Sequence, residues 1–317
     1  MKVAVTGANG FVGSALSDFL KSRNIEVSRL VRTKEHKDKD YYEIGNLGEK
    51  NNKIEWSKIL KDVDCIVHCA GRVHLMKDAT TDQLSAYRKI NVLGTRRLAE
   101  EAIKNGVQRL VYLSSIKVNG EKTNNQSFKI TDRVNPVDNY SISKLEAEEE
   151  LLRISKASGL EVVIIRPPLI YGPYVKANFL RLLNLIHTGV PLPFLRLNNK
   201  RSMISLTNLI DFIVCCINHP SANGEKFLIS DGSDFSTSEL IRLLAKSMGS
   251  HSYLFYLPLF LFRISGLILG KSNEVERLTE SLQIDISHSK ELLGWKPVQT
   301  AQEGMAEVID NFLSNKN

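Results

Sequence analysis

The chain has 317 residues and a net charge of +7, with 43% hydrophobic and 24% charged residues. These values are ordinary for a soluble globular protein, so they exclude a disordered chain and allow one or two domains. A nucleic-acid partner is not expected, because the lysines cluster mainly in residues 34–39, where acidic residues interleave them. Neither a metal-binding nor a disulfide pattern is formed by the cysteines, which are Cys65, Cys69, Cys215 and Cys216. Reduced thiols, and a strand pattern that begins at Lys2, lead us to expect a cytoplasmic protein without a bound metal.

The first predicted strand runs into a glycine-rich loop. Residues 3–5 are apolar, the segment TGANGFVG follows at residues 6–13, and a helical pattern comes next. Glycines permit a tight turn and let backbone N–H groups approach a pyrophosphate, while the helix N-terminus faces the anion. A plain turn is the alternative, but the position in a βαβ unit favours nucleotide binding. The expected cofactor contacts are Gly7, Asn9, Gly10, Phe11, Val12 and Gly13.

The second predicted strand, residues 27–31, ends without the acidic residue that NAD-binding proteins usually offer to the adenine ribose. Arg32 stands there instead and, aided by Arg29 or Lys34, can accept a 2′-phosphate. A surface arginine without a role is the alternative. The sequence therefore indicates NADPH, or NADH, as the cofactor.

A further strand and a long helix are expected in the next part of the chain. Residues 64–71 form an apolar strand, in which His68 is better explained by packing than by catalysis. The small residues at its end, Ala70 among them, suit close passage of a cofactor. A helical pattern over residues 83–104 carries Asn91.

The strand expected at residues 110–115 ends in two serines, Ser114 and Ser115. This edge of a parallel sheet is where doubly wound folds place their ligands, although a strand-end serine is commonly only a turn former. The polar segment 117–139 that follows is expected to be a loop able to cover a substrate.

Tyr140 and Lys144 stand four residues apart at the start of a helical pattern. Four residues make about one turn, so the two side chains share a face of the helix. The ammonium group of Lys144 is therefore expected to lower the pKa of the Tyr140 phenol from its reference value near ~10. Such a pair also arises by chance, and its weight comes from the nucleotide-binding pattern that precedes it.

The regular pattern is interrupted by prolines after the next predicted strand, at residues 162–165. We place a domain boundary near Gly172. Residues 1–172 are expected to form a doubly wound parallel (Rossmann) sheet, and residues 173–317 a smaller mixed α/β substrate domain, some segments of which can return to the first domain. The helices expected in the second part cover residues 178–188, 208–218 and 239–248, with a strand at residues 227–230 and a capping box at Ser236–Glu239.

Residues 253–269 are the most hydrophobic part of the sequence. Pro258 and Arg263 interrupt them, and they fall short of the ~20 apolar residues that span a bilayer. We expect them to be buried against the substrate domain, and peripheral contact with a membrane surface is the alternative.

Together these features resemble the extended short-chain dehydrogenase/reductase family, of the NAD-dependent epimerase/dehydratase type. The motifs that match, in order, are TGxxGxxG at residues 6–13, Asn91, Ser115, Tyr140-x-x-x-Lys144 and RPPLIYGP at residues 166–173. The resemblance implies that Tyr140 is the acid/base and that Ser115 binds the substrate oxygen. It also implies that Lys144 holds the nicotinamide ribose and that Asn91 supports the site. Further cofactor contacts implied in this way are Ala70, Asn91 and Pro167.

In that family the smaller domain holds a nucleotide-sugar. The resemblance implies UDP-sugar contacts at Ser114, Ser115, Asn178, Arg201 and Arg277. Arg201 would pair with the diphosphate, although each of these can equally be an ordinary loop residue. An Arg-x-Gly-Asp segment seen in many sugar epimerases is absent, and residues 276–285 stand in its place with Arg277 as the substitute arginine.

Three short segments, residues 71–76, 200–203 and 281–285, resemble a bacterial branch that reduces UDP-4-keto-6-deoxy-N-acetylhexosamine to UDP-N-acetylquinovosamine or its 4-epimer. We therefore expect a homodimeric NAD(P)H-dependent 4-ketoreductase of lipopolysaccharide O-antigen synthesis. A UDP-hexose or UDP-N-acetylhexosamine 4-epimerase with tightly bound NAD is the alternative. A non-catalytic nucleotide-binding relative is disfavoured, because Ser115, Tyr140 and Lys144 are all present.

Overall fold

The structure is a computed structural model that describes residues 1–33, 38–49, 54–73, 82–268, 270 and 272–316. Three sequence-based expectations fall partly outside these residues. They concern Lys34 as an aid to Arg32, residues 74–76 of the segment 71–76, and Leu269 at the end of the apolar run.

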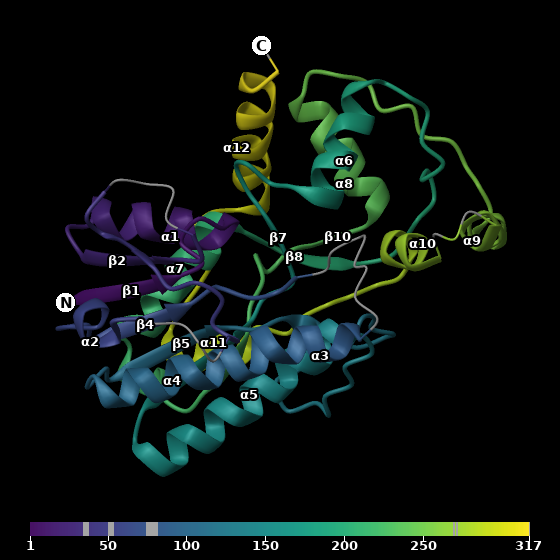
Figure 1. Ribbon diagram of the computed structural model, residues 1–317. Coiled ribbons are helices and arrows are strands. Elements are labelled where there is room, and N and C mark those ends of the chain that lie inside the picture. The colour runs from purple at the N-terminus through teal and green to yellow at the C-terminus, as the bar shows by residue number, and fades with distance from the viewer. Residues whose placement is uncertain (34–37, 50–53, 74–81, 269, 271, 317) are drawn as a thin grey trace.

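A seven-stranded parallel sheet is the largest element of the molecule (Figure 1). In spatial order its strands are β3 (Tyr41–Glu43), β2 (Glu26–Val31), β1 (Lys2–Thr6), β4 (Cys65–His68), β5 (Arg109–Leu113), β6 (Glu161–Arg166) and β9 (Lys226–Leu228). The order reverses between β1 and β4, which opens a crevice at the carboxyl ends of these two strands. The predicted doubly wound sheet is confirmed, and its crevice is the place where a dinucleotide is expected.

Helices cover both faces of this sheet (Figure 1). Successive strand residues point to opposite faces, so Val3 and Val5 join one core while Ala4 joins the other. The first core is closed by α1 (Phe11–Ser22), α7 (Leu206–Asn218) and α11 (Ser287–Leu293). The second core is closed by α2 (Trp56–Ile59), α4 (Gly94–Lys104) and α5 (Asn139–Ser158). A short helix, α3 (Gln83–Tyr87), lies beside α5, and a π-helical turn, Arg88–Leu93, joins it to α4.

A smaller unit forms around a three-stranded sheet, which is the mixed α/β part that the sequence predicts. Its strands, in spatial order, are β10 (Asp234–Phe235), β8 (Arg201–Ser205) and β7 (Leu169–Tyr171). A third core packs α6 (Ala177–His187), α8 (Thr237–Ser247) and α12 (Ala301–Ser314) together above this sheet (Figure 1). Helix α8 begins with the expected capping box between Ser236 and Glu239. The remaining elements are α9 (Leu259–Ile268), α10 (Ser272–Thr279) and two single 3-10 turns at Ile116–Val118 and Pro220–Ala222.

The chain returns from the smaller unit to the large sheet more than once. Strand β9 pairs in parallel with β6 and so extends that sheet. Helix α7 packs against α1, and Phe212 on α7 meets Trp295, just after α11, with ring centroids 4.8 Å apart. Residues on both sides of Gly172 therefore build the first core, and the two parts of the chain are interleaved.

The apolar run at residues 253–268 corrects a sequence-based expectation. We expected burial against the substrate domain, but within α9 the side chain of Phe262 is buried while those of Phe260, Leu267 and Ile268 are exposed. The reason is that α9 lies at the rim of the smaller unit (Figure 1), and of its described side chains it is Phe262 that joins the third core. Among the described residues, no helix combines the length and the apolar character needed to cross a membrane.

Candidate active site

The glycine loop between β1 and α1 has the backbone geometry of a dinucleotide cradle. Gly7 has φ +67°, a backbone conformation that residues other than glycine rarely adopt. The N–H of Gly10 donates to the carbonyl oxygen of Gly7 over 2.8 Å. A Cβ atom at Gly13 would lie 2.3 Å from the same oxygen. Only glycine at residues 7 and 13 therefore lets helix α1 start this close to the loop.

The N-terminus of α1 fits a bound pyrophosphate. Gly10 is its N-cap and supplies no side-chain hydrogen bond, and the first turn contains no acidic residue. The first N–H groups of a helix have no partners within it and carry the positive end of its dipole. Asn9, Phe11 and Val12 lie at this turn, so the predicted contacts surround one position where an anionic diphosphate fits.

Arg32 follows the last residue of β2 and is exposed, as expected for a residue that meets the adenosine end of a dinucleotide. Arg29 does not aid it, which corrects the sequence-based expectation. The guanidinium of Arg29 is buried, hydrogen-bonds Asp18, lies 3.5 Å from Asp40 and stacks over the ring of Tyr41. Its charge is already paired on the far side of the strand.

His68 is a packed residue, as predicted. Its two ring nitrogens lie 2.6 Å from the Thr6 hydroxyl and 2.9 Å from the Thr95 hydroxyl. Burial and, to a smaller extent, the positive charge of Lys144 lower the pKa of His68 to about 3, so the ring is neutral. The Thr6 hydroxyl also accepts a hydrogen bond from the N–H of Ala70 over 3.1 Å, which ties the end of β4 to β1 beside the glycine loop. Sequence reasoning missed this role of Thr6.

Asn91 lies on the π-helical turn between α3 and α4, where the sequence predicts an unbroken helix. Its side-chain oxygen accepts from the N–H of Arg72 over 2.8 Å, and its amide donates to the carbonyl of Arg72 and to the Ser143 hydroxyl. Single π-turns are frequent at functional sites. Asn91 thereby fastens the segment after β4 to helix α5, next to the predicted catalytic residues.

Ser115, Tyr140 and Lys144 come together at the carboxyl end of β5. Ser115 hydrogen-bonds the phenol of Tyr140, and both side chains are only half-buried, so a ligand can reach them. Lys144 lies one turn further along α5, and its ammonium group donates to the carbonyl of Leu113 over 2.7 Å. The ring of Tyr87 packs edge-on against Tyr140 with centroids 6.2 Å apart. The structure thus joins two elements that are far apart in the sequence.

The expected electrostatic effect of Lys144 on Tyr140 is not found. Burial raises the pKa of Tyr140 to about 12, and the hydrogen bond with Ser115 lowers it only in part. Burial also lowers the pKa of Lys144 to about 8, although Glu148 and Cys69 oppose this shift. The physical reason is that the Lys144 ammonium points to a backbone carbonyl and to the face of Tyr112, 4.3 Å from its centroid. Desolvation, and not the neighbouring charge, controls the phenol.

Ser114 lies in a buried hydrogen-bond network, and its contact with a substrate stays a prediction. Its hydroxyl donates to Glu148 over 2.5 Å. Arg166, at the end of β6, donates to the same carboxylate and also to Asn119 over 2.8 Å. This network fixes α5 one turn beyond Lys144. The sequence contains a sign of this pair, because Glu148 lies on the inner face of a predicted helix and Arg166 follows an apolar strand. The sequence alone does not show that these two residues meet.

Arg201 and Arg277 approach one another on the smaller unit. Burial lowers the pKa of Arg201, the charge of Arg277 lowers it further, and Glu121 acts in the opposite direction. The side chain of Arg201 donates to the carbonyl of Glu280 over 3.1 Å. Within the part of the chain that the structure describes, neither guanidinium has a carboxylate within ion-pair distance. Two adjacent cations without a counter-ion favour a bound dianion such as a diphosphate.

The polar loop after β5 closes this side of the site. The N–H groups of Thr123 and Phe128 donate to the carbonyls of Ser281 and Gln283, both over 2.8 Å. The loop therefore runs beside the segment that leads from α10 back to the large sheet. Asn178 lies at the start of α6 and is exposed. Pro167 follows β6, and its carbonyl accepts from the N–H of Ile116 over 3.0 Å.

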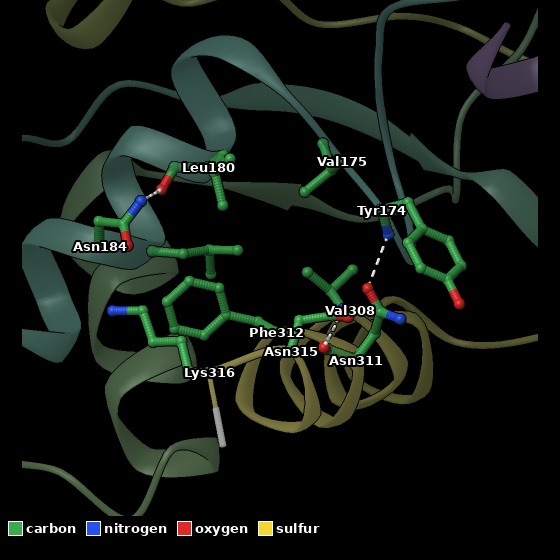
Figure 2. A pocket seen from close by; sticks show the side chains of 10 residues that line it. Tyr174, Val175, Leu180, Asn184, Val308, Asn311, Phe312, Asn315 and Lys316 are labelled. Carbon is green, nitrogen blue, oxygen red and sulfur yellow. Dashed lines mark hydrogen bonds between the residues drawn. The ribbon is translucent and has the colours of Figure 1, made fainter.

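A separate pocket lies between α6 and α12 (Figure 2). Leu180, Leu183 and Phe312 give it an apolar wall, and the N–H of Tyr174 donates to the side chain of Asn311 over 2.8 Å. It contains none of the residues that the sequence predicts to bind cofactor or substrate. We therefore place the chemistry in the crevice of the large sheet and not in this pocket.

Comparison with known proteins agrees with this geometry. The sequence profile of the NAD dependent epimerase/dehydratase family matches residues 3–230. A UDP-glucose 4-epimerase of Vibrio cholerae is 44% identical to this chain, over 99% of this chain and 96% of that protein. An N-acetyl-alpha-D-glucosaminyl-diphospho-ditrans,octacis-undecaprenol 4-epimerase of Escherichia coli O157:H7 is 27% identical, over 97% of this chain and 94% of that protein.

Solved structures share the fold. MoeE5 in complex with UDP-glucose and NAD superposes with a TM-score of 0.79 at 23% identity, covering 100% of both chains. The curated relatives above are named for epimerisation and not for reduction of a 4-keto sugar. They therefore favour the epimerase alternative over the expected ketoreductase.

Proposed function

Because the chain belongs to the NAD-dependent epimerase/dehydratase family, we propose that it inverts carbon 4 of a UDP-sugar of the glucose or N-acetylglucosamine type. The observation that carries this proposal is the 44% identity to a UDP-glucose 4-epimerase over 99% of the chain. The N-acetylated sugar is included because the more distant relative is named for 4-epimerisation of an N-acetylglucosaminyl group, which in that case is linked through a diphosphate to undecaprenol. The arrangement of Ser115, Tyr140 and Lys144 supports the same chemistry.

The residues of this chain have separable tasks in such a reaction. Ser115 and Tyr140 would hold the oxygen on carbon 4 between two hydroxyl groups, and Tyr140 would take up and return its proton. The chemistry that NAD supplies when bound is reversible hydride transfer at carbon 4. Lys144 is buried beside the end of β5. At pH values below its pKa of about 8 it would carry a positive charge next to the site. Arg201 and Arg277 would hold the diphosphate, which fixes the nucleotide while the sugar ring turns.

The epimerase proposal is tested without added cofactor. Purified protein is incubated with UDP-glucose and, separately, with UDP-N-acetylglucosamine, and the galacto product is measured by nuclear magnetic resonance. We expect an equilibrium mixture from at least one substrate, with NAD released when the protein is denatured. Tyr140→Phe should lower the rate by about 10²–10⁴ while leaving the NAD content unchanged, because only the transferable proton is lost. Tyr174→Phe, the same change at an exposed tyrosine, is the control and should leave the rate unchanged.

A 4-ketoreductase is the second candidate, and the observation that favours it is Arg32. The end of β2 carries this exposed cation where a ribose-binding carboxylate would help to retain NAD. In this reaction Tyr140 would protonate the alkoxide that forms when carbon 4 accepts hydride. A role in O-antigen synthesis and a homodimer belong to this same proposal.

The two candidates differ in stoichiometry. UDP-4-keto-6-deoxy-N-acetylglucosamine is added with NADPH or NADH, and the absorbance of the reduced cofactor is followed. If one cofactor is consumed for each sugar, and neither UDP-glucose nor UDP-N-acetylglucosamine is interconverted with its epimer, the reductase is correct and the epimerase is excluded. If UDP-glucose or UDP-N-acetylglucosamine is interconverted with its epimer and no reduced cofactor is consumed, the epimerase is correct and the reductase is excluded.

A further inference from the structure

Helix α9 presents an apolar stripe to solvent. Phe260, Ile264, Leu267 and Ile268 are spaced i, i+4, i+7 and i+8, so they share one face of the helix. Their side chains are 61%, 48%, 76% and 77% exposed. A helix at the surface of a folded protein normally turns such a stripe towards the core. Here it faces outward, and contiguous exposed apolar surface of this kind marks an interaction site.

The stripe is held in this orientation by contacts on the opposite face. Phe262 is only 6% exposed, and its ring stacks on that of Phe194 with centroids 5.5 Å apart and planes 9° apart. The segment before the helix is tied to the same loop, because the N–H of Leu192 donates to Tyr253 and the N–H of Leu195 donates to Phe255. Gly266 packs against Val275 of α10. Turning the stripe inward would break all of these contacts.

The charges around the stripe identify what covers it. Two exposed cations lie beside the stripe, Arg263 on α9 itself and Arg196 in the loop that holds the segment before the helix, and the whole chain has a net charge of +7. Arg263 lies on α9 next to the stripe with most of its side chain exposed, and it makes a 3.5 Å ion pair with Glu280. The guanidinium of the exposed Arg196 lies over the ring of Tyr256, 5.3 Å from its centroid. The covering surface must therefore be apolar in its centre and anionic at its rim.

A second copy of this chain does not have that character. In a symmetric dimer through α9 the same patch would meet itself, so each set of cations would face an identical set. An anionic lipid bilayer supplies both requirements, because acyl chains receive the apolar stripe and phosphate headgroups receive the cations. Exposed tyrosines such as Tyr253 and Tyr256 are also typical of the headgroup level.

We propose that helix α9 lies in the interface of an anionic membrane, parallel to its surface, and anchors the protein peripherally. The helix has ten residues and would not span the bilayer. This inference does not depend on the reaction that the protein catalyses. It requires that the stripe be accessible and the patch be cationic.

The test is co-sedimentation of the full chain with sucrose-loaded vesicles. We expect binding to vesicles that contain phosphatidylglycerol, much weaker binding to pure phosphatidylcholine, and weakening with added salt. The double variant Leu267→Glu/Ile268→Glu should bind the anionic vesicles at least about tenfold more weakly, because two apolar side chains are lost and two like charges are gained. Val298→Glu is the matched control, since it makes the same kind of change at an exposed apolar residue outside α9. Circular dichroism and turnover of a UDP-sugar should be unchanged in both variants.

Two outcomes overturn the proposal. If the native protein stays in the supernatant with anionic vesicles at low salt, α9 is not a membrane anchor. If light scattering instead shows a dimer that the double variant dissociates, while vesicles bind neither protein, the stripe is covered by a second copy. Equal vesicle binding by the double variant and the native protein would likewise place any membrane contact elsewhere.

Discussion

Loss of water controls the titratable side chains around the candidate active site. Burial raises the pKa of Tyr140 to about 12 and lowers those of Lys144 and His68 to about 8 and about 3. All three shifts favour the neutral form, as expected where the charged form loses hydration. In the proposed reaction, proton transfer by Tyr140 would therefore depend on the groups that approach it from the substrate side, in addition to Ser115.

His68 makes stability depend on pH. Its folded pKa is depressed below the ordinary value of 6.5, so between pH 6.5 and about 3 the unfolded chain binds a proton that the native state does not. Stability should therefore fall on acidification through this range, and this one residue should contribute about 2 kcal/mol of the loss between pH 7 and pH 5.

The measurement is urea unfolding at pH 7 and pH 5 for the native protein and His68→Gln. The variant should be less stable at pH 7, because the contacts with Thr6 and Thr95 change, but its stability should fall less between the two pH values. An identical pH dependence of the two proteins would mean that His68 is protonated in the fold or remains neutral in both states.

At the scale of elements, helix α5 carries the candidate residues Tyr140 and Lys144, and its position is set by contacts at its start and near its middle. Asp138 caps it, accepting from the N–H of Ser141 over 2.7 Å, and Lys117 and Ser141 hold the pKa of Asp138 well below its usual range. Further along, Glu148 pairs with Arg166 of β6, and both side chains are buried. These contacts fix the height and rotation of Tyr140 relative to Ser115.

Breaking the buried pair should be costly, and removing both partners less so. Glu148→Leu leaves the Arg166 charge buried and unpaired, so we expect a loss of about 3–5 kcal/mol of stability. The double variant Glu148→Leu/Arg166→Met should recover a large part of this loss, because no charge is then buried alone. Glu146→Gln is the control: Glu146 also lies on α5, but its ion pair with Arg88 of the π-helical turn is partly exposed, so the change should have little effect.

The measurement is urea unfolding of the native protein, the single variants Glu148→Leu and Arg166→Met, the double variant and the control. The first four of these proteins give the coupling energy between Glu148 and Arg166. A double variant as unstable as the sum of the two single variants would show that the pair does not act as a unit.

At the scale of the whole molecule, the two units share their cores. The face of the large sheet that carries Val3 and Val5 is covered by α7 and α11, which follow Gly172 in the sequence. Phe212 and Phe227 meet with ring centroids 5.4 Å apart in the same core. The crevice for the dinucleotide is therefore built on a sheet that the first half of the chain cannot complete.

A fragment of residues 1–172 should consequently fail to fold. It would expose the face of the sheet that α7 covers and would lack β9 at the edge beside β6. We expect circular dichroism without a cooperative melt, strong binding of a hydrophobic dye, and recovery of both properties when residues 173–317 are co-expressed. A fragment that melts cooperatively by itself would show that residues 1–172 form an independent domain.

The sequence by itself determined the features that depend on neighbouring residues. The glycine loop at residues 6–13, the alternation of strands and helices, and the one-turn spacing of Tyr140 and Lys144 are all local, because a turn, a helix face or a cap is decided within a few residues. For the same reason the helices expected at residues 178–188, 208–218 and 239–248 are found within two residues of their starts and one of their ends.

Only the tertiary structure decided what depends on residues far apart in the chain. Hydration decides whether Lys144 lowers the pKa of Tyr140, and hydration is a property of the packed interior. The sequence does not reveal that Ser114 hydrogen-bonds Glu148, because the two residues are 34 positions apart and meet only in the folded chain. Nor does composition tell whether an apolar helix such as α9 is covered, because burial depends on which surfaces the fold brings against it.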